Sequence, residues 1–225
     1  MSEDGKIIES WQKNVAPWID AIRNNEISSR TLVTNDAILK AILAQQPRNV
    51  LDIGCGEGWL VRALVNSDID ALGIDVIPEF IEYAQHFGKG RFRLSPYEKI
   101  TPLNLNEKFD VVVCNFSLLG EEPVNGLFKQ IPQLLEKQAV FIVQTIHPGT
   151  ACGDQSGWRQ GSWEGFSEQF RQPAPWYFRT LEAWKSLFAK HQLQLRAIHE
   201  PVNPETRAVA SIIFVAAVAD ASEAT

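Results

Sequence analysis

The sequence predicts an α/β fold, a doubly wound and mostly parallel seven-stranded sheet with helices on both faces and an antiparallel last strand. Short aliphatic and β-branched runs alternate with amphipathic stretches, as in βαβ units. A glycine-rich turn at residues 54–58 follows the first such run. The last two predicted strands are separated only by a proline-containing turn at residues 200–205, which suits an antiparallel pair.

Two helices are predicted before the first strand. The first covers residues 7–24 and carries Trp11 and Trp18 on one face. The second begins at residue 34 or 35, where Thr and Asn are favourable N-cap residues, and ends at Pro47.

Strands and helices alternate along the rest of the chain. Strands are predicted at residues 49–53, 71–74, 92–94, 109–114, 139–146, 194–199 and 208–219. Helices are predicted at residues 57–66, from Pro78 onward, at 124–135 and at 180–191. The strand at 109–114 is apolar enough to be central and buried on both faces.

A length of 225 residues predicts one domain, residues 1–225. We divide it into four parts: N-terminal capping helices (1–47), a cofactor-binding core (48–146), an aromatic insertion (147–179), and a C-terminal helix with a strand pair (180–220).

Charge and composition limit the function classes. The net charge is −6, from 21 basic and 27 acidic residues, which argues against nucleic acid as the main partner. The polar N-terminus and the interruption of the longest apolar run by Ser211 predict neither a leader peptide nor a membrane span. The three cysteines form no C-x-x-C pair, which fits a reducing compartment, so a cytoplasmic location is expected. The sequence leaves the oligomeric state open.

The glycine-rich turn is the most specific motif. Asp52 ends the first strand, and Gly54, Gly56 and Gly58 follow at alternate positions. A glycine turn that leads into a helix N-terminus lets a ligand approach backbone N–H groups closely. The dinucleotide fingerprint G-x-G-x-x-G would need glycine where Trp59 stands, so the spacing is G-x-G-x-G.

A second acid, Asp75, ends the next strand. With this acid, the motif resembles that of the class I S-adenosylmethionine-dependent methyltransferases, and the resemblance extends over about residues 49–220, with features of bacterial small-molecule members. The resemblance implies that Asp75 binds the cofactor ribose, whose two hydroxyl donors a carboxylate can accept. It implies S-adenosyl-L-methionine as cofactor and S-adenosyl-L-homocysteine as product. The expected cofactor contacts are Asp52, Gly54, Cys55, Gly56, Gly58, Asp75, Val76, Tyr97, Glu98, Asn115 and Phe116.

Two basic residues have alternative interpretations. Arg30, in the polar link between the N-terminal helices, either binds the cofactor carboxylate or is an exposed surface residue. His147 follows the fifth strand and has a side chain that titrates near neutrality, so it is the candidate general base. His147-Pro148 is equally consistent with a plain turn into the insertion. No His/Cys/Asp/Glu cluster has metal-ligand spacing, so no metal is expected.

The aromatic insertion follows a strand's carboxyl end, where such sheets bind ligands. We interpret it as a wall of the substrate pocket, with Trp158, Trp176 and Tyr177 as candidate substrate contacts; the alternative is a flap that buries its own aromatics. The resemblance then implies methyl transfer to a small, partly apolar metabolite. An NAD(P)-dependent oxidoreductase and a non-catalytic S-adenosylmethionine sensor or scaffold remain the alternatives.

Overall fold

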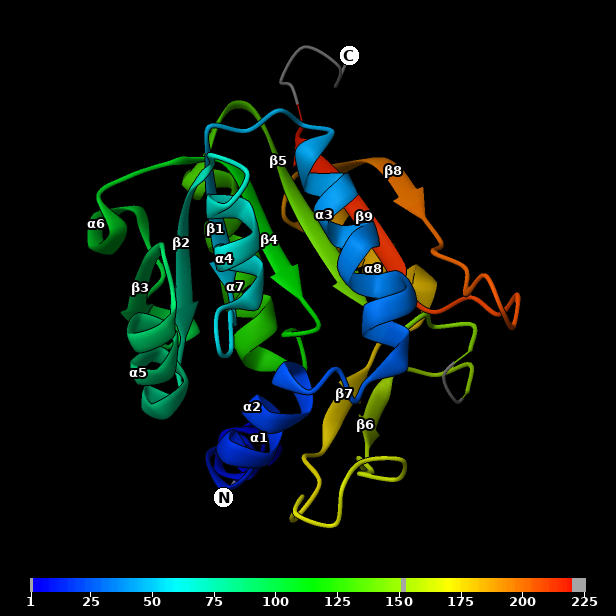
Figure 1. Cartoon of the computed structure of the whole chain (residues 1–225). Coiled ribbons are helices and arrows are strands. Elements are labelled where there is room, and N and C mark those ends of the chain that lie inside the picture. The colour runs from blue at the N-terminus through cyan, green and yellow to red at the C-terminus, as the bar shows by residue number, and fades with distance from the viewer. Residues whose placement is uncertain (1, 151–152, 220–225) are drawn as a thin grey trace.

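The computed structural model describes residues 2–150 and 153–219. Its main sheet has seven strands in the order β3-β2-β1-β4-β5-β9-β8 (Figure 1). Strands β1 to β5 are mutually parallel, and β9 is antiparallel to both of its neighbours. The strands are β1 (Asn49–Ile53), β2 (Asp70–Asp75), β3 (Arg91–Leu94), β4 (Phe109–Asn115), β5 (Leu135–Thr145), β8 (Leu193–His199) and β9 (Ile212–Val218). The predicted fold class is confirmed.

Helices cover both faces of the sheet. The helices α3 (Asn35–Leu43), α4 (Trp59–Val65) and α5 (Pro78–Phe87) pack on one face, and α7 (Glu122–Leu134) and α8 (Leu181–Lys190) pack on the other. Each face buries its own apolar layer, because alternate residues of a strand point to opposite sides. The remaining helix of the core, α6 (Pro102–Leu105), is a single turn.

The N-terminal region differs from the prediction of one helix over residues 7–24. It forms α1 (Glu3–Lys13) and α2 (Val15–Arg23), which are separated at Asn14. A π-helix (Arg30–Thr34) then leads directly into α3. The break follows from Pro17, which has no N–H to bond the Lys13 carbonyl, and the Asn14 side chain at the break bonds to a distant segment, as described below.

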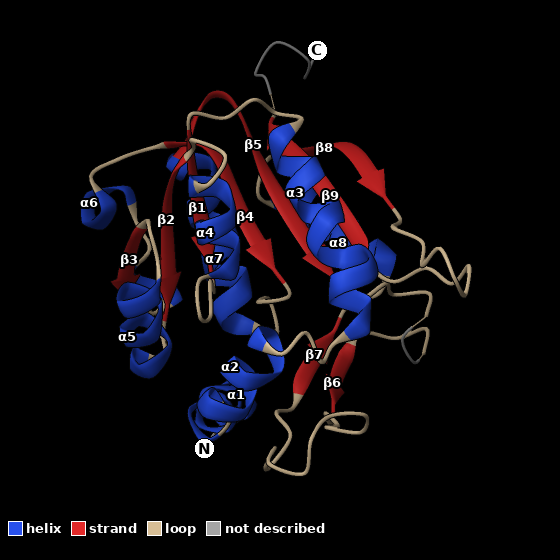
Figure 2. Cartoon of the chain, in the orientation of Figure 1, coloured by secondary structure: helices blue, strands red, loops and turns tan. Residues whose placement is uncertain are grey.

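The aromatic insertion contains two strands that the sequence did not predict. These strands, β6 (Gly157–Arg159) and β7 (Trp176–Phe178), form a separate antiparallel sheet (Figure 2). Three-residue strands are too short to show an alternating pattern. In Figure 1, β6, β7, α1 and α2 lie together beyond the ends of β4 and β5 at which those arrows point. These elements therefore cover the edge of the sheet that carries the predicted site.

No helix among residues 2–150 and 153–219 is both long and apolar enough to cross a membrane.

Candidate functional site

The glycine turn lies between β1 and α4, and all three glycines have left-handed φ angles, +78°, +54° and +86°. A Cβ at Gly54 would lie 2.3 Å from the Cβ of Ser117, and one at Gly58 would lie 2.7 Å from the ring of Phe92. These two positions require glycine for packing. A Cβ at Gly56 would meet nothing closer than the Trp18 indole nitrogen at 3.8 Å, so this backbone borders open space. The turn can therefore admit a ligand at its middle glycine.

Asp75 lies next to that glycine. Its Oδ2 accepts a hydrogen bond from the Gly56 N–H, and its Oδ1 accepts one from the Ile77 N–H, both at 2.9 Å. Burial raises the pKa of Asp75, whereas these backbone hydrogen bonds oppose the shift. Each oxygen keeps one lone pair, so the carboxylate can still accept the two hydroxyl donors of a ribose.

Asp52, at the end of β1, is almost completely buried, and its Oδ1 has no hydrogen-bond partner among the described residues. Burial raises the pKa of Asp52 to about 8, and the charges of Asp75 and Glu57 add to the shift. An unpartnered buried carboxyl is costly unless a ligand satisfies it.

The sequence analysis missed Glu57. This residue is buried, accepts a hydrogen bond from the Trp59 N–H at 3.2 Å, and pairs with Arg62. An acid inside the glycine turn, followed five positions later by arginine, is a local signal that could have identified the pair.

Arg30 lies beside the glycine turn and is not an exposed surface residue. Its guanidinium carbon is 5.1 Å from the ring centroid of Trp59 and 5.7 Å from that of Trp18. Burial lowers the pKa of Arg30 to about 10, and the Glu57 carboxylate opposes the shift. One terminal nitrogen is buried without a partner among the described residues. The rings of Trp18 and Trp59 thus position the Arg30 guanidinium, which keeps an N–H donor without an acceptor among the described residues.

The end of β4 contributes Asn115, whose buried Oδ1 lacks a partner among the described residues. Phe116 follows with a left-handed φ of 55°, and its N–H donates to the Gln144 carbonyl at 2.8 Å. A strained non-glycine residue persists only where its surroundings determine it, and such residues gather at functional sites.

The loop after β3 is bound to this region by Tyr97, whose hydroxyl donates to the Ser117 carbonyl at 2.8 Å. Burial raises the pKa of Tyr97. Glu98 is exposed, and the half-buried Val76 packs in the apolar cluster under α2. Of the two predicted cofactor contacts in this loop, Tyr97 is thus already engaged by the protein. Cys55 is buried inside the glycine turn.

The unpartnered groups around the turn are complementary to an amino-acid zwitterion. Arg30 offers a donor suited to a carboxylate, and Asp52 and Asn115 offer acceptors suited to an ammonium group. With Asp75 available for a ribose, the residues present fit the amino-acid and ribose parts of S-adenosylmethionine.

The aromatic insertion is fixed to the loop after β4. The Tyr177 N–H donates to the Leu119 carbonyl at 2.7 Å, and the rings of Trp158 and Tyr177 meet edge to face at 5.5 Å. Trp176 is half-buried on the same short strand. The three predicted substrate contacts therefore share one small sheet.

A buried cation that the sequence analysis missed supports this sheet. The guanidinium of Arg179 stacks on Tyr177 and Trp184 at 4.7 and 5.2 Å and donates to the Gly120 carbonyl at 2.8 Å. Burial lowers the pKa of Arg179 to about 10.

His147 makes contacts through both ring nitrogens. Its Nδ1 accepts a hydrogen bond from the Gly149 N–H at 3.0 Å, and its Nε2 lies 2.8 Å from an oxygen of Glu200. With Nδ1 as acceptor, the neutral ring carries its proton on Nε2, and this N–H donates a hydrogen bond to the Glu200 carboxylate. To act as a general base, His147 would have to release the Gly149 contact, so this arrangement favours the turn role.

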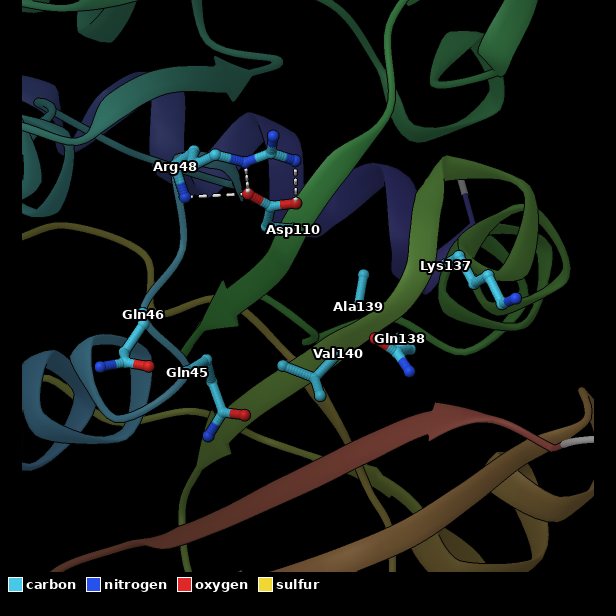
Figure 3. A pocket seen from close by; sticks show the side chains of 8 residues that line it. All are labelled: Gln45, Gln46, Arg48, Asp110, Lys137, Gln138, Ala139 and Val140. Carbon is cyan, nitrogen blue, oxygen red and sulfur yellow. Dashed lines mark hydrogen bonds and ion pairs between the residues drawn. The ribbon is translucent and has the colours of Figure 1, made fainter.

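A shallow cavity of about 240 Å³ lies elsewhere, near the start of β4 (Figure 3). Arg48 and Asp110 form a two-pronged ion pair beside it. It lies at the opposite end of β4 from Asn115, so it is separate from the glycine turn. Among the described residues, no group of three or more His, Cys, Asp or Glu side chains is placed to hold a metal ion.

Comparison with known proteins agrees with this geometry. Residues 27–198 match the model of a methyltransferase domain family. A malonyl-(acyl-carrier protein) O-methyltransferase of Acetivibrio thermocellus is 32% identical over 44% of this chain and 35% of its own length. A ubiquinone biosynthesis O-methyltransferase of Pelagibacter ubique is 30% identical over 56% of this chain and 51% of its own. The chain thus spans about half or less of these relatives.

Two solved structures share the fold. A 1,6-didemethyltoxoflavin-N1-methyltransferase of Burkholderia thailandensis, with 1,6-didemethyltoxoflavin and S-adenosylhomocysteine bound, has a TM-score of 0.66 at 18% identity; the alignment covers 96% of this chain and 89% of that chain. An S-adenosylmethionine-dependent methyltransferase of Clostridium acetobutylicum has a TM-score of 0.65 at 15% identity; the alignment covers 91% of this chain and 98% of that chain. Because the family model matches well over half of the chain, this protein belongs to the methyltransferase domain family.

Proposed function

We propose that this protein is an S-adenosylmethionine-dependent methyltransferase that acts on a small, partly apolar metabolite. The observation that carries the proposal is the set of unpartnered buried groups at the glycine turn. Arg30, Asp52 and Asn115 offer one donor and two acceptors that find no counterpart in the described part of the chain. The bound cofactor would supply a methyl group already activated on a sulfonium.

The residues have distinct tasks in this mechanism. Asp75 holds the ribose, and Arg30 pairs with the carboxylate of the cofactor's amino-acid part while Trp18 and Trp59 exclude water from that pair. Asp52 accepts from the ammonium group. Since the methyl donor is activated, the protein's main contribution is to align the acceptor atom, the methyl group and the sulfur.

The acceptor pocket is proposed to lie under the aromatic insertion. The rings of Trp158, Trp176 and Tyr177 offer an apolar surface that would suit a flat or hydrophobic acceptor. His147 stays the candidate base for acceptors that must lose a proton, subject to release of its Gly149 contact.

Measurements of ligand binding and of turnover distinguish the proposed function from its two alternatives. A nicotinamide-dependent oxidoreductase is disfavoured by Trp59, which stands where the dinucleotide fingerprint needs glycine. A non-catalytic sensor would bind the cofactor without turnover; the built-up aromatic wall beside the glycine turn favours an enzyme.

The test is calorimetric titration of the protein with S-adenosylhomocysteine and, separately, with NADH. Micromolar binding of the first and none of the second is the expected result, and a screen of small aromatic acceptors with labelled S-adenosylmethionine would follow. Binding of NADH alone would overturn the proposal.

A further inference from the structure

A buried polar residue, Asn14, lies at the break between α1 and α2. Its side chain is 0% exposed and makes three hydrogen bonds. The amide nitrogen donates to the carbonyls of Ser10 at 2.8 Å and of Arg171 at 2.7 Å, and the amide oxygen accepts from the Arg171 N–H at 2.7 Å. Asn14 thus binds both backbone polar groups of one residue in the aromatic insertion.

A second set of contacts strengthens this connection. The buried Ser10 hydroxyl donates to the Gln172 carbonyl at 2.6 Å, and Gln172 has a left-handed φ of 43°. The Trp163 indole N–H donates to the Arg171 carbonyl at 3.0 Å. The Arg171 carbonyl therefore receives two donors, one from Asn14 and one from Trp163, which uses both of its lone pairs.

Aromatic packing joins the same two regions. The rings of Trp163, Phe166 and Phe170 contact one another with centroids 4.6 to 5.4 Å apart. Trp163 also meets Trp11 of α1 at 5.8 Å. Residues 163–172, which we call the docked segment, are therefore held on the N-terminal helices by both polar and apolar contacts.

The same helix face reaches the proposed cofactor site. Trp18 lies four positions after Asn14, so both side chains project from one side of α2. The Trp18 ring contacts the Arg30 guanidinium, and its nitrogen lies 3.8 Å from the position that a Cβ on Gly56 would take. Through Trp18, α2 therefore contacts Arg30 and approaches the glycine turn, and through Asn14 at its N-cap it contacts the docked segment.

We propose that Asn14 is a positioning residue that transmits cofactor occupancy to the docked segment, which is part of the aromatic insertion proposed to cover the acceptor pocket. A carboxylate bound by Arg30 fixes the guanidinium against Trp18 and so stabilises α2, and Asn14 passes that stabilisation to the docked segment. The acceptor pocket under the aromatic insertion is then completed on the cofactor-loaded protein, so cofactor binds before acceptor. This inference rests on the proposed function.

The test is hydrogen exchange, followed by mass spectrometry, of the docked segment with and without saturating S-adenosylhomocysteine. In the native protein we expect the ligand to slow exchange in residues 163–172 about fivefold or more, the lower end of typical coupling between sites. The Arg171 amide is the direct reporter, because its N–H donates to Asn14. Unchanged exchange there in ligand-bound native protein would overturn the inference without any variant.

Asn14→Ala should abolish this ligand effect and, since coupling is reciprocal, weaken S-adenosylhomocysteine binding by about the same factor. Asn24→Ala is the matched control, because the Asn24 side chain is exposed and bonds only to Glu26 nearby. The control should retain the native ligand effect. Faster exchange in Asn14→Ala that still responds to ligand as in the native protein would reduce Asn14 to a structural contact. Failure of the native protein to bind S-adenosylhomocysteine would instead refute the proposed function.

Discussion

Cofactor binding should release a proton from Asp52. Burial raises the pKa of this carboxyl to about 8, so in the free protein it is neutral over most of the working pH range. If its unpartnered oxygen faces the ammonium group of the cofactor, the complex requires the carboxylate. Binding below pH about 8 must then expel the proton.

The size of the effect follows from that pKa. At pH 6.5 the carboxyl is about 97% protonated, so close to one proton leaves for each ligand bound. Each pH unit below about 8 costs about 1.4 kcal/mol of binding free energy, a tenfold loss of affinity. Between pH 8.5 and 6.5, the affinity for S-adenosylhomocysteine should fall about 25-fold.

In the ligand-free protein, the stability contributed by Asp52 should fall as the pH rises, which is opposite to the rise of ligand affinity with pH. A folded-state pKa above the ordinary value of 3.8 means that the neutral acid is favoured by folding. The contribution of Asp52 to stability is therefore complete below pH about 4 and is lost as the pH rises to about 8. Chemical denaturation of ligand-free protein across this range would measure the loss.

The binding assay is calorimetry at pH 6.5 in phosphate and in imidazole, whose different ionisation heats give the number of protons released. Asp52→Asn keeps an acceptor of the same shape but cannot titrate. Its binding of S-adenosylhomocysteine should therefore release no proton, and its affinity should not depend on pH. Native binding that releases no proton and changes less than threefold between pH 6.5 and 8.5 would refute the reasoning. Release that persists in Asp52→Asn would transfer the linkage to Asp75, whose pKa is also raised by burial.

Four further outcomes are expected. Asp75→Ala should weaken S-adenosylhomocysteine binding by about 1–3 kcal/mol through lost charged hydrogen bonds; unchanged affinity in calorimetry would remove the ribose assignment. Gly58→Ala should lower stability by about 1–3 kcal/mol, because its Cβ would lie 2.7 Å from an aromatic ring at a φ of +86°. Gly126→Ala, at a helical position with nothing within 4 Å, should instead stabilise by about 0.5–1 kcal/mol, and thermal melts would compare the two. His147→Ala should leave cofactor affinity intact and, given the occupied ring nitrogens, leave turnover nearly unchanged once an acceptor is found; a fall of about 100-fold would assign it as the base.

The cofactor side of the molecule was predictable because its determinants are local. The strand predicted at residues 49–53 is β1, and Asp75 ends β2 as expected. A buried parallel strand is a continuous apolar run, and a turn of left-handed residues demands glycine, so both can be identified within a few positions. The same locality explains why the glycine turn and its two acids could be identified without the fold.

The N-terminal break had a local signal that the prediction of one helix did not use. Pro17 lies within residues 7–24 and has no N–H to bond the Lys13 carbonyl, so a helix through this region is interrupted near Asn14. The tertiary contact of Asn14 could not be predicted, because its partner, the backbone of Arg171, lies 157 positions away. Periodicity reports which face of a helix is apolar, but it cannot report a polar partner supplied by a distant loop.

This difference between local and distant determinants also limits what family membership explains. The family match begins at residue 27, so it includes Arg30 and the glycine turn but leaves out α1 and α2. Those two helices supply Asn14 and Trp18, which connect the docked segment to the cofactor site. We therefore expect substitutions on the inner face of α1 and α2 to change acceptor preference while cofactor chemistry is kept. We expect acceptor specificity to depend on where the N-terminal helices meet the aromatic insertion, because that contact, together with the Tyr177–Leu119 hydrogen bond, holds the insertion beside the proposed cofactor site.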